Sequence, residues 1–190
     1  FTTQIAAPNL SLSSPSLVLR HVNAVMLSAF LRTQDRRGRL DKLTLDWWML
    51  PEGGSRQERF VAWCENFDPA RQEEVSRGLQ ALIRRTVLEG GETLETLAAK
   101  VAGAAAEHAK TWRSELKAID EQVQALSAKD DEDRVPLKAL QAQRKRLVNE
   151  YLLRELATSG FLPGYGFPTD ITTFETLNKD SAELTRMREG

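Results

Sequence analysis

The sequence predicts an all-α domain that carries a long antiparallel coiled-coil hairpin and an ordered loop of Pro, Gly and aromatic residues. Three observations lead to this fold class. Apolar residues recur at helical spacing after Ser14 and Pro15. They recur in a heptad-like pattern between residues 92 and 128, where no proline interrupts the chain. The segment FLPGYGFPTD, residues 161–170, then combines three aromatics with two prolines and two glycines, which suits neither a helix nor an ordinary strand.

Residues 1–91 are predicted to form an N-terminal helical subdomain. Ser14 is a favourable N-cap and Pro15 a favourable first residue for a helix that ends near Thr33. The broad apolar face of this helix needs burial. Its members are Leu17, Val18, His21, Val22, Val25, Met26, Ala29 and Phe30.

Three shorter features complete this subdomain. Residues 43–50 mix Leu and Trp without a clean period, which fits either a short strand or one buried helical turn. Ser55 is expected to cap a second helix that ends at Trp63 or Cys64. A third helix is expected to begin at Asp68–Pro69 and to be terminated by Gly90–Gly91.

Residues 92–159 are predicted to form the antiparallel helical hairpin. The apolar positions of its first helix run, with one phase slip, through Leu94, Leu97, Val101, Ala104, His108, Trp112, Leu116, Ile119, Val123 and Leu126. Four consecutive acids at 130–133 and then Pro136 break this helix, and a return helix is expected from Leu137 to Thr158. Two helices joined by a short polar loop pack antiparallel.

Residues 160–190 are predicted to hold the aromatic Pro/Gly loop and a short terminal helix. Gly160 is suited to end the return helix. Phe161, Tyr165 and Phe167 are expected to lie on an ordered, docked interdomain loop, because a flexible linker would leave their apolar surface exposed. Asp180 is expected to cap a helix over residues 180–189.

Composition excludes several classes of function. With 26 basic and 27 acidic residues, the net charge of −1 gives no global attraction to nucleic acid or membrane, so any such contact is local. The sequence contains no run of about 18 apolar residues, so no membrane span is predicted. The N-terminus lacks the pattern of a signal peptide and an initiator Met, so we expect a fragment of a larger protein of the cytoplasm.

Motifs that carry chemistry are missing from the sequence. We find no nucleotide-binding loop of the GxxxxGK[ST] type, no GxGxxG, no HExxH and no GxSxG, so no catalytic, cofactor-binding or metal-binding residue is assigned. The single cysteine, Cys64, is interpreted as a buried, inert thiol. The acidic run at 130–133 is interpreted as a solvated hairpin tip.

The candidate contact with nucleic acid is a small basic loop. Its members are Arg36, Arg37, Arg39 and Lys42. The plain interpretation is a solvated loop, and the functional one is contact with backbone phosphates, for which clustered arginines are well suited.

Other side chains have a plain interpretation that we favour. His21 is expected to be packed and hydrogen-bonded, and two of the three residues Arg144–Arg146 are expected on the solvent face of a helix. Trp47 and Trp48, like the loop aromatics, can stack on bases in principle. Because no basic residues are interleaved with them, we favour packing in a core or an interface.

Two segments resemble a known family. YLLRELATSGFLPGYGFPTDITTF, residues 151–174, is similar to a segment of large superfamily 2 DEAD/DEAH-box helicases that carry a C-terminal zinc-binding domain of unknown function, such as the phage-defence helicases of the MrfA and DrmA types. SPSLVLRHVNAVMLSAFLR, residues 14–32, resembles the helix that follows their second helicase lobe. The rest of the chain shows no such resemblance.

The resemblance implies a place in a larger protein rather than an activity. The chain would link the motor to the C-terminal domain, as a non-catalytic helical region that contacts the remaining domains of the helicase and also DNA. ATP and Mg²⁺ would be bound elsewhere in that helicase. The alternative is a structural module whose hairpin binds another protein and which has no role with nucleic acid.

Overall fold

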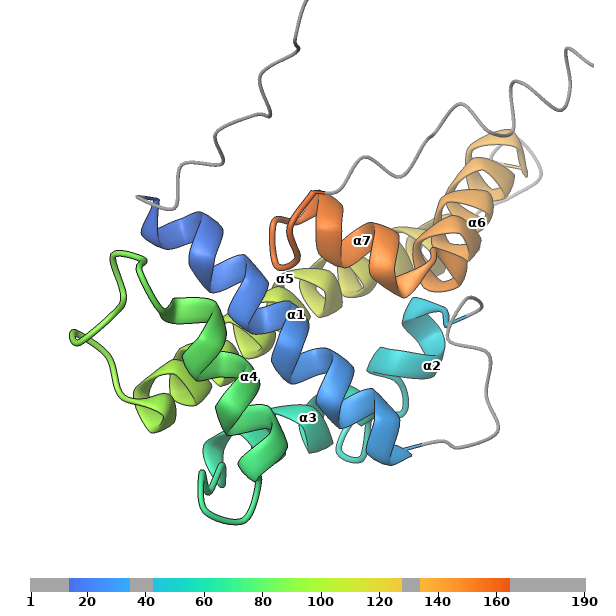
Figure 1. Ribbon diagram of the computed structural model, residues 1–190. Helices are drawn as coiled ribbons and strands as arrows, with labels where there is room; N and C mark the ends of the chain where they lie inside the picture. The colour runs from blue at the N-terminus through green and yellow to red at the C-terminus, as the bar shows by residue number, and fades with distance from the viewer. Residues whose placement is uncertain (1–13, 35–42, 128–133, 165–190) are drawn as a thin grey trace, which may run out of the picture.

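The computed structural model describes residues 14–34, 43–127 and 134–164, and the elements within these ranges are helices (Figure 1). An isolated antiparallel bridge between Thr44 and Tyr151 accompanies them. The all-α fold class is therefore confirmed for this part of the chain. The helices are α1 (Pro15–Gln34), α2 (Leu45–Met49), α3 (Arg56–Glu65), α4 (Glu73–Ile83), α5 (Leu94–Ser127), α6 (Arg134–Asn149) and α7 (Leu152–Thr158).

Helix α1 contacts three other helices, α3, α4 and α5. Its start at Pro15 and its end at Gln34 agree with the sequence-based prediction. Val22 and Met26 are fully buried, as expected from the apolar face. Asn23, Leu27 and Leu31 are buried as well, because neighbours cover α1 on more than one side.

Residues 45–49 form the buried helical turn α2 rather than a strand. Trp48 is buried, and its ring lies 6.1 Å from that of Phe30 and 5.8 Å from that of Phe60. Trp47 stays half-buried, with the guanidinium of Arg56 4.2 Å above its ring. Packing in the core, not an exposed stacking surface, thus accounts for both tryptophans.

Helix α3 begins with the cap that the sequence predicts. The Ser55 hydroxyl accepts a hydrogen bond from the Glu58 N–H, and the Glu58 carboxylate accepts one from the Ser55 N–H, which completes a capping box. Partial burial opposes ionisation of Glu58, but hydrogen bonds from the N–H groups of Gly53 and Ser55 and the charge of Arg113 outweigh it. The pKa of Glu58 is therefore below its ordinary value.

The predicted boundaries of the third helix were wrong. Helix α4 begins at Glu73, because the Asp68 carboxylate accepts hydrogen bonds from the N–H groups of Ala70 and Arg71 and stabilises a turn there. It ends at Ile83, before Arg85 takes a positive φ of 63°. The glycines at 90 and 91 lie in the turn that leads into α5.

Helix α5 confirms the long uninterrupted helix, although the predicted set of buried residues was wrong at Ala104, which is exposed. The line of buried positions runs through Leu94, Ala98, Val101, Ala105, Ala109, Trp112, Leu116 and Ile119. This spacing averages close to the 3.6 residues per turn of a straight helix, so no phase slip is needed. The predicted series takes the same seven steps from Leu94 to Ile119, and it departs from the buried face at Ala104, which is exposed, and at His108, which is half-buried.

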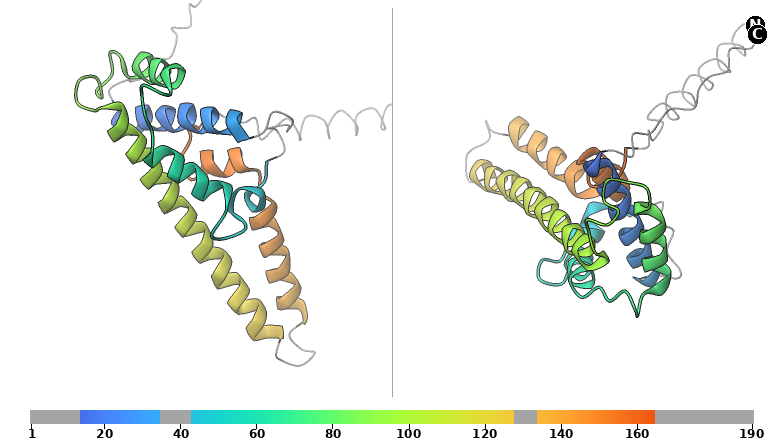
Figure 2. Two further views of the ribbon diagram at one scale, coloured as in Figure 1. Left: turned by 90° about the horizontal axis from the view of Figure 1, so that it is seen from below. Right: turned by 60° about the vertical axis from the view of Figure 1, so that its left-hand side comes forward.

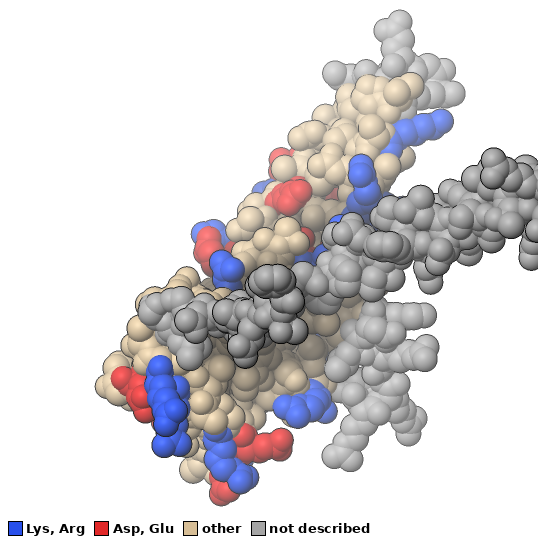
Figure 3. Space-filling view, turned by 45° about the horizontal axis from the view of Figure 1, so that its top comes forward, with Lys and Arg blue, Asp and Glu red and all other residues tan. Residues whose placement is uncertain are grey.

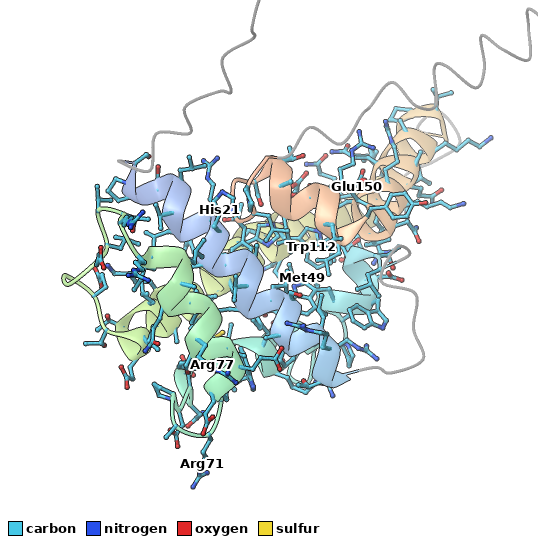
Figure 4. The ribbon with its side chains drawn as sticks, in the orientation of Figure 1. His21, Met49, Arg71, Arg77, Trp112 and Glu150 are labelled. Carbon is cyan, nitrogen blue, oxygen red and sulfur yellow. The ribbon has the colours of Figure 1, made fainter. Side chains whose placement is uncertain are left out.

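The predicted single return helix was also wrong, because two helices, α6 and α7, take its place. Helix α6 already begins at Arg134, since Pro136 is tolerated in a first turn. The break falls where the chain meets the segment before α2 (Figure 4 labels Glu150 at this junction). The Leu45 N–H donates to the Glu150 carbonyl at 3.0 Å, and the Leu152 N–H donates to the Leu43 carbonyl at 2.8 Å. These bonds replace the intrahelical ones.

The described part of the chain has a body and a projecting arm (Figure 2). Helices α5 and α6 lie side by side, run in opposite directions and together form the arm. Helices α1 and α7 lie in the body, at the end away from the tip of the arm. Helices α2 and α3 occupy the space where α5 and α6 diverge toward the body.

Candidate interdomain junction and basic face

The first candidate site is the junction between α1 and the turn after α7. The Asn23 side-chain amide donates a hydrogen bond to the carbonyl of Phe161 at 2.8 Å, and both residues are buried. The Leu162 N–H donates to the Leu156 carbonyl at 2.8 Å, which folds the chain back onto the end of α7. Phe161 and Leu162 belong to the same buried cluster as Val22. The start of the aromatic loop is thus fixed to α1.

Gly160 makes this close approach possible. Its φ of 78° lies in the left-handed region, where a side chain is strained. A Cβ atom at this position would lie 3.2 Å from Nη2 of Arg20 on α1. Both the backbone conformation and the neighbouring guanidinium therefore favour glycine, as the sequence predicted for the end of the return helix.

A mostly buried histidine of α5 contacts α7. His108 Nε2 lies 3.7 Å from the Glu155 carboxylate, and 10% of the His108 side chain is exposed. Burial lowers the pKa of His108, and the negative charge and hydrogen bonding of Glu155 oppose this shift without cancelling it. His108 is therefore held mainly as the neutral imidazole, which suits a packing role between two helices.

Most of the predicted site residues lie outside the described residues. This applies to the basic loop of Arg36, Arg37, Arg39 and Lys42, to Tyr165 and Phe167, and to the acids at 130–133. The predicted terminal helix over 180–189 lies outside them too. Of the three loop aromatics, the structure describes Phe161, which is buried. The predictions for the other residues stay predictions.

Two of the plain interpretations can be compared with the structure. Cys64 is buried, and burial, together with the charge of Glu65, raises the pKa of its thiol to about 12. This agrees with an inert thiol. His21 is half-buried on α1, in agreement with a packed histidine.

The second candidate site is the solvent face of α6. Lys138, Lys145 and Arg146 are exposed, whereas Arg144 forms an ion pair with Asp120 of α5 at 2.6 Å. The expectation that two of the residues 144–146 face solvent is therefore confirmed. The sequence reasoning missed Lys138 and the composition of the helix as a whole, since residues 134–149 contain five basic residues and no acidic residue.

A shallow groove lies between the 50–52 segment and α5, with a volume of about 650 Å³. It is lined by Leu50, Glu52, Lys110, Trp112, Arg113, Ser114, Leu116, Lys117, Asp120, Glu121 and Gln124. Its charged lining residues carry both signs: along α5 the basic residues Lys110, Arg113 and Lys117 are followed by the acidic residues Asp120 and Glu121.

The described residues contain no group of three or more His, Cys, Asp or Glu side chains that could hold a metal ion. None of the helices in this part of the chain combines the length and the apolar character needed to cross a membrane. Comparisons of the chain with protein-family models, with curated proteins and with solved structures find no match. Function must therefore be argued from the residues themselves.

Proposed function

We propose that this chain is a non-catalytic helical region of a larger ATP-dependent DNA helicase or translocase, where it links the motor to a C-terminal domain. The parent protein binds ATP and Mg²⁺ in its motor and acts on DNA in the cytoplasm, in defence against phages. This chain contributes the mechanical connection and a contact with DNA through Arg36, Arg37, Arg39 and Lys42.

One observation supports this proposal above the others. The two segments that resemble the helicase family, residues 14–32 and 151–174, are more than a hundred residues apart in sequence, yet Asn23 of the first segment bonds to Phe161 of the second. Two segments that belong to one junction in the helicase family would be expected to meet in this way. The described residues outside these two segments form the rest of the body and the arm.

The positions of the junction and the arm suit a linking region. The start of α1 and the end of the Phe161 turn lie at the body end of the molecule, while α5 and α6 project away from it (Figure 2). The hairpin arm would stay accessible to DNA or to a protein.

The sequences that flank this chain in its parent test the proposal directly. We expect a GxxxxGK[ST] loop and an Asp-Glu-x-His motif upstream, and a cysteine-bearing domain downstream. A parent protein without ATPase motifs would refute the helicase assignment. The isolated chain is expected not to hydrolyse ATP.

A matched pair of variants tests the linking role in the parent protein. Phe161 and Phe67 are both buried, with exposures of 6% and 7%, but only Phe161 lies at the junction. Phe161→Ala should uncouple DNA-stimulated ATP hydrolysis from movement along DNA, whereas Phe67→Ala should lower stability without uncoupling. Equal behaviour of the two variants would assign Phe161 a packing role alone.

A protein-binding arm is the second candidate function, and one observation favours it. The arm has a half-buried apolar seam toward its tip, formed by Val123, Leu126, Leu137 and Leu140. A partner could cover this seam. In that case binding would be lost in Leu137→Ala with Leu140→Ala and would depend little on salt, whereas contact with DNA would weaken steeply as salt rises.

A further inference from the structure

Helix α6 is the most asymmetrically charged element of the described structure. Its 16 residues, Arg134–Asn149, include Arg134, Lys138, Arg144, Lys145 and Arg146 and no Asp or Glu, so five positive charges and no negative ones give +5. In a chain with a net charge of −1, this is a local concentration of positive charge. This charge lies on α6, which forms one side of the projecting arm (Figure 2).

The exposed cations of α6 have no acidic partner within the described residues. In α6, Arg144 forms an ion pair with Asp120, while Lys138, Lys145 and Arg146 form none with a described residue. The first acid after the helix, Glu150, lies 3.7 Å from Arg154 and is paired there. By contrast, Lys100, Lys110 and Lys117 of α5 each pair with a glutamate.

The positions of these cations suit an extended anionic partner. Lys138 and Lys145 are seven residues apart, so they project from nearly the same side of the helix about 10 Å apart. Arg146 widens this basic face by one helical position. In Figure 3, Lys and Arg atoms stand along the right-hand edge of the arm.

We propose that the exposed face of α6 binds the phosphate backbone of nucleic acid, with Lys138, Lys145 and Arg146 as its main contacts. Between them the helix exposes Gln141 and Gln143, whose side-chain amides can donate to phosphate or sugar oxygens. No aromatic side chain lies on this helix, which argues against insertion into a lipid surface. The choice of nucleic acid among polyanions rests on the proposed function.

The acids at 130–133 precede α6 and oppose binding of a phosphate chain near the tip. Lys145 is eleven residues after the first residue of α6, Arg134, or about 16 Å along the helix axis. This is about two Debye lengths at physiological salt, so screening leaves Lys145 and Arg146 attractive. The end of α6 nearest the body is therefore expected to bind most strongly.

The test measures fluorescence anisotropy of labelled duplex and single-stranded DNA of equal length, titrated with the 190-residue chain at several salt concentrations. The variant Lys138→Gln with Lys145→Gln and Arg146→Gln should lose at least about ten-fold in affinity. The slope of log K against log salt should fall in magnitude by about 2.7 for duplex and about 2.1 for single strands, for three lost contacts. The two DNA forms distinguish which one the face prefers.

The matched control is Lys100→Gln with Lys110→Gln and Lys117→Gln, which removes the same charge from α5. Circular dichroism melts verify that both triple variants are folded. An equal loss in the control would overturn the proposal, because total charge and not the α6 face would then bind DNA. The proposal is also overturned if the unaltered chain binds no DNA at low salt, or if the α6 variant loses binding to phosphatidylserine vesicles but not to DNA.

These results are separable from the proposed function. The motor is tested by the flanking motifs and by ATP hydrolysis of the parent, neither of which involves α6. Binding through α6 in a parent without a motor would support the basic face and refute the helicase. A parent whose ATP hydrolysis is stimulated by DNA, together with a chain that does not bind DNA through α6, would support the helicase and refute the basic face.

Discussion

The two helices of the arm, α5 and α6, differ in how deeply they are buried. Helix α5 has 34 residues, ten of them buried, and it contacts α1, α3, α4 and α6. Helix α6 has 16 residues and none that is fully buried among those with described side chains. Since burial of apolar surface is the main stabilising term, α5 is part of the core of the body, while α6 rests on one face of α5 and on α2.

Their charges differ in the same way. Helix α5 carries five acidic and four basic residues, a net charge of −1, against +5 for α6. Much of the charge on α5 is compensated within the body, as in the ion pair of Arg113 with Glu58 at 2.9 Å. The comparison indicates that α5 is built for stability and that α6 presents its side chains to something else.

The largest expected effect separates the two helices by stability. Leu116→Ala in α5 should cost about 2–5 kcal/mol of unfolding free energy, because Leu116 is 9% exposed and its removal leaves a cavity. Leu147→Ala in α6 should cost roughly half of this or less, since Leu147 is only half-buried. Urea denaturation followed by circular dichroism measures both. Equal losses would mean that α6 is as much part of the core as α5.

Amide hydrogen exchange should sharpen the same contrast. Amides in the middle of α5 should exchange only on global unfolding, whereas those of α6 should exchange through local opening of the arm. We expect at least a ten-fold difference in protection, or about 1.4 kcal/mol. Mass spectrometry of peptides from residues 100–116 and 138–148 measures it. Matching protection in the two peptides would contradict a loosely held α6.

Much of the fold could be predicted because local signals agreed with tertiary packing. Ser14 with Pro15 marked the start of α1, and Ser55 with Glu58 marked that of α3. The break at Glu150 could not be predicted, because it depends on backbone bonds to residues 43–45, far away in sequence. Local propensity contains no information on such a partner.

The residues of the candidate sites could likewise be predicted where they have a local sequence signal and not where they lack one. Gly160 and Phe161 were recognised from composition, since a glycine and an aromatic loop after a helix have direct structural meaning. The partner Asn23 was not, because a polar residue beside an apolar face has no sequence signal for burial. The basic face of α6 was not predicted, because no single cation marks it. Its signal is the absence of acidic residues over the whole helix.

A pH titration should sharpen the comparison through His108, which anchors α5 to α7 and not to α6. Because burial lowers its pKa in the folded state below the ordinary 6.5, the unfolded chain binds the proton more readily. Stability should be fully present above pH 6.5 and fall as the pH drops below it, by at most about 1.4 kcal/mol per pH unit, until the folded pKa is reached.

The control is His108→Gln, which should flatten the stability curve just below pH 6.5. Glu58 does not interfere in this window. Its pKa is lowered, so its contribution is lost only as the pH falls below the ordinary carboxylate range. A curve that keeps its slope in the His108 variant would assign the pH dependence to another group.

The smallest expected effect concerns the ion pair that joins the arm's two helices, between Arg144 and Asp120. Hydrogen bonding to Asp120 raises the pKa of Arg144, and the two side chains are 43% and 38% exposed. Water and salt screen a pair this exposed, so a double-mutant cycle of Arg144→Gln and Asp120→Asn should give about 0.2–1 kcal/mol at low salt. The Lys117–Glu121 pair within α5, at 3.8 Å, is the matched control and should give about 0.3–0.5 kcal/mol. If apolar contacts with α5 hold α6 in place, both coupling energies stay small and decline as the salt concentration rises. Removal of the Arg144–Asp120 pair then raises amide hydrogen exchange in α6 alone. A coupling of several kcal/mol at Arg144 would show instead that electrostatics fasten α6 to α5, and the contrast between a buried α5 and a loosely held α6 would no longer stand.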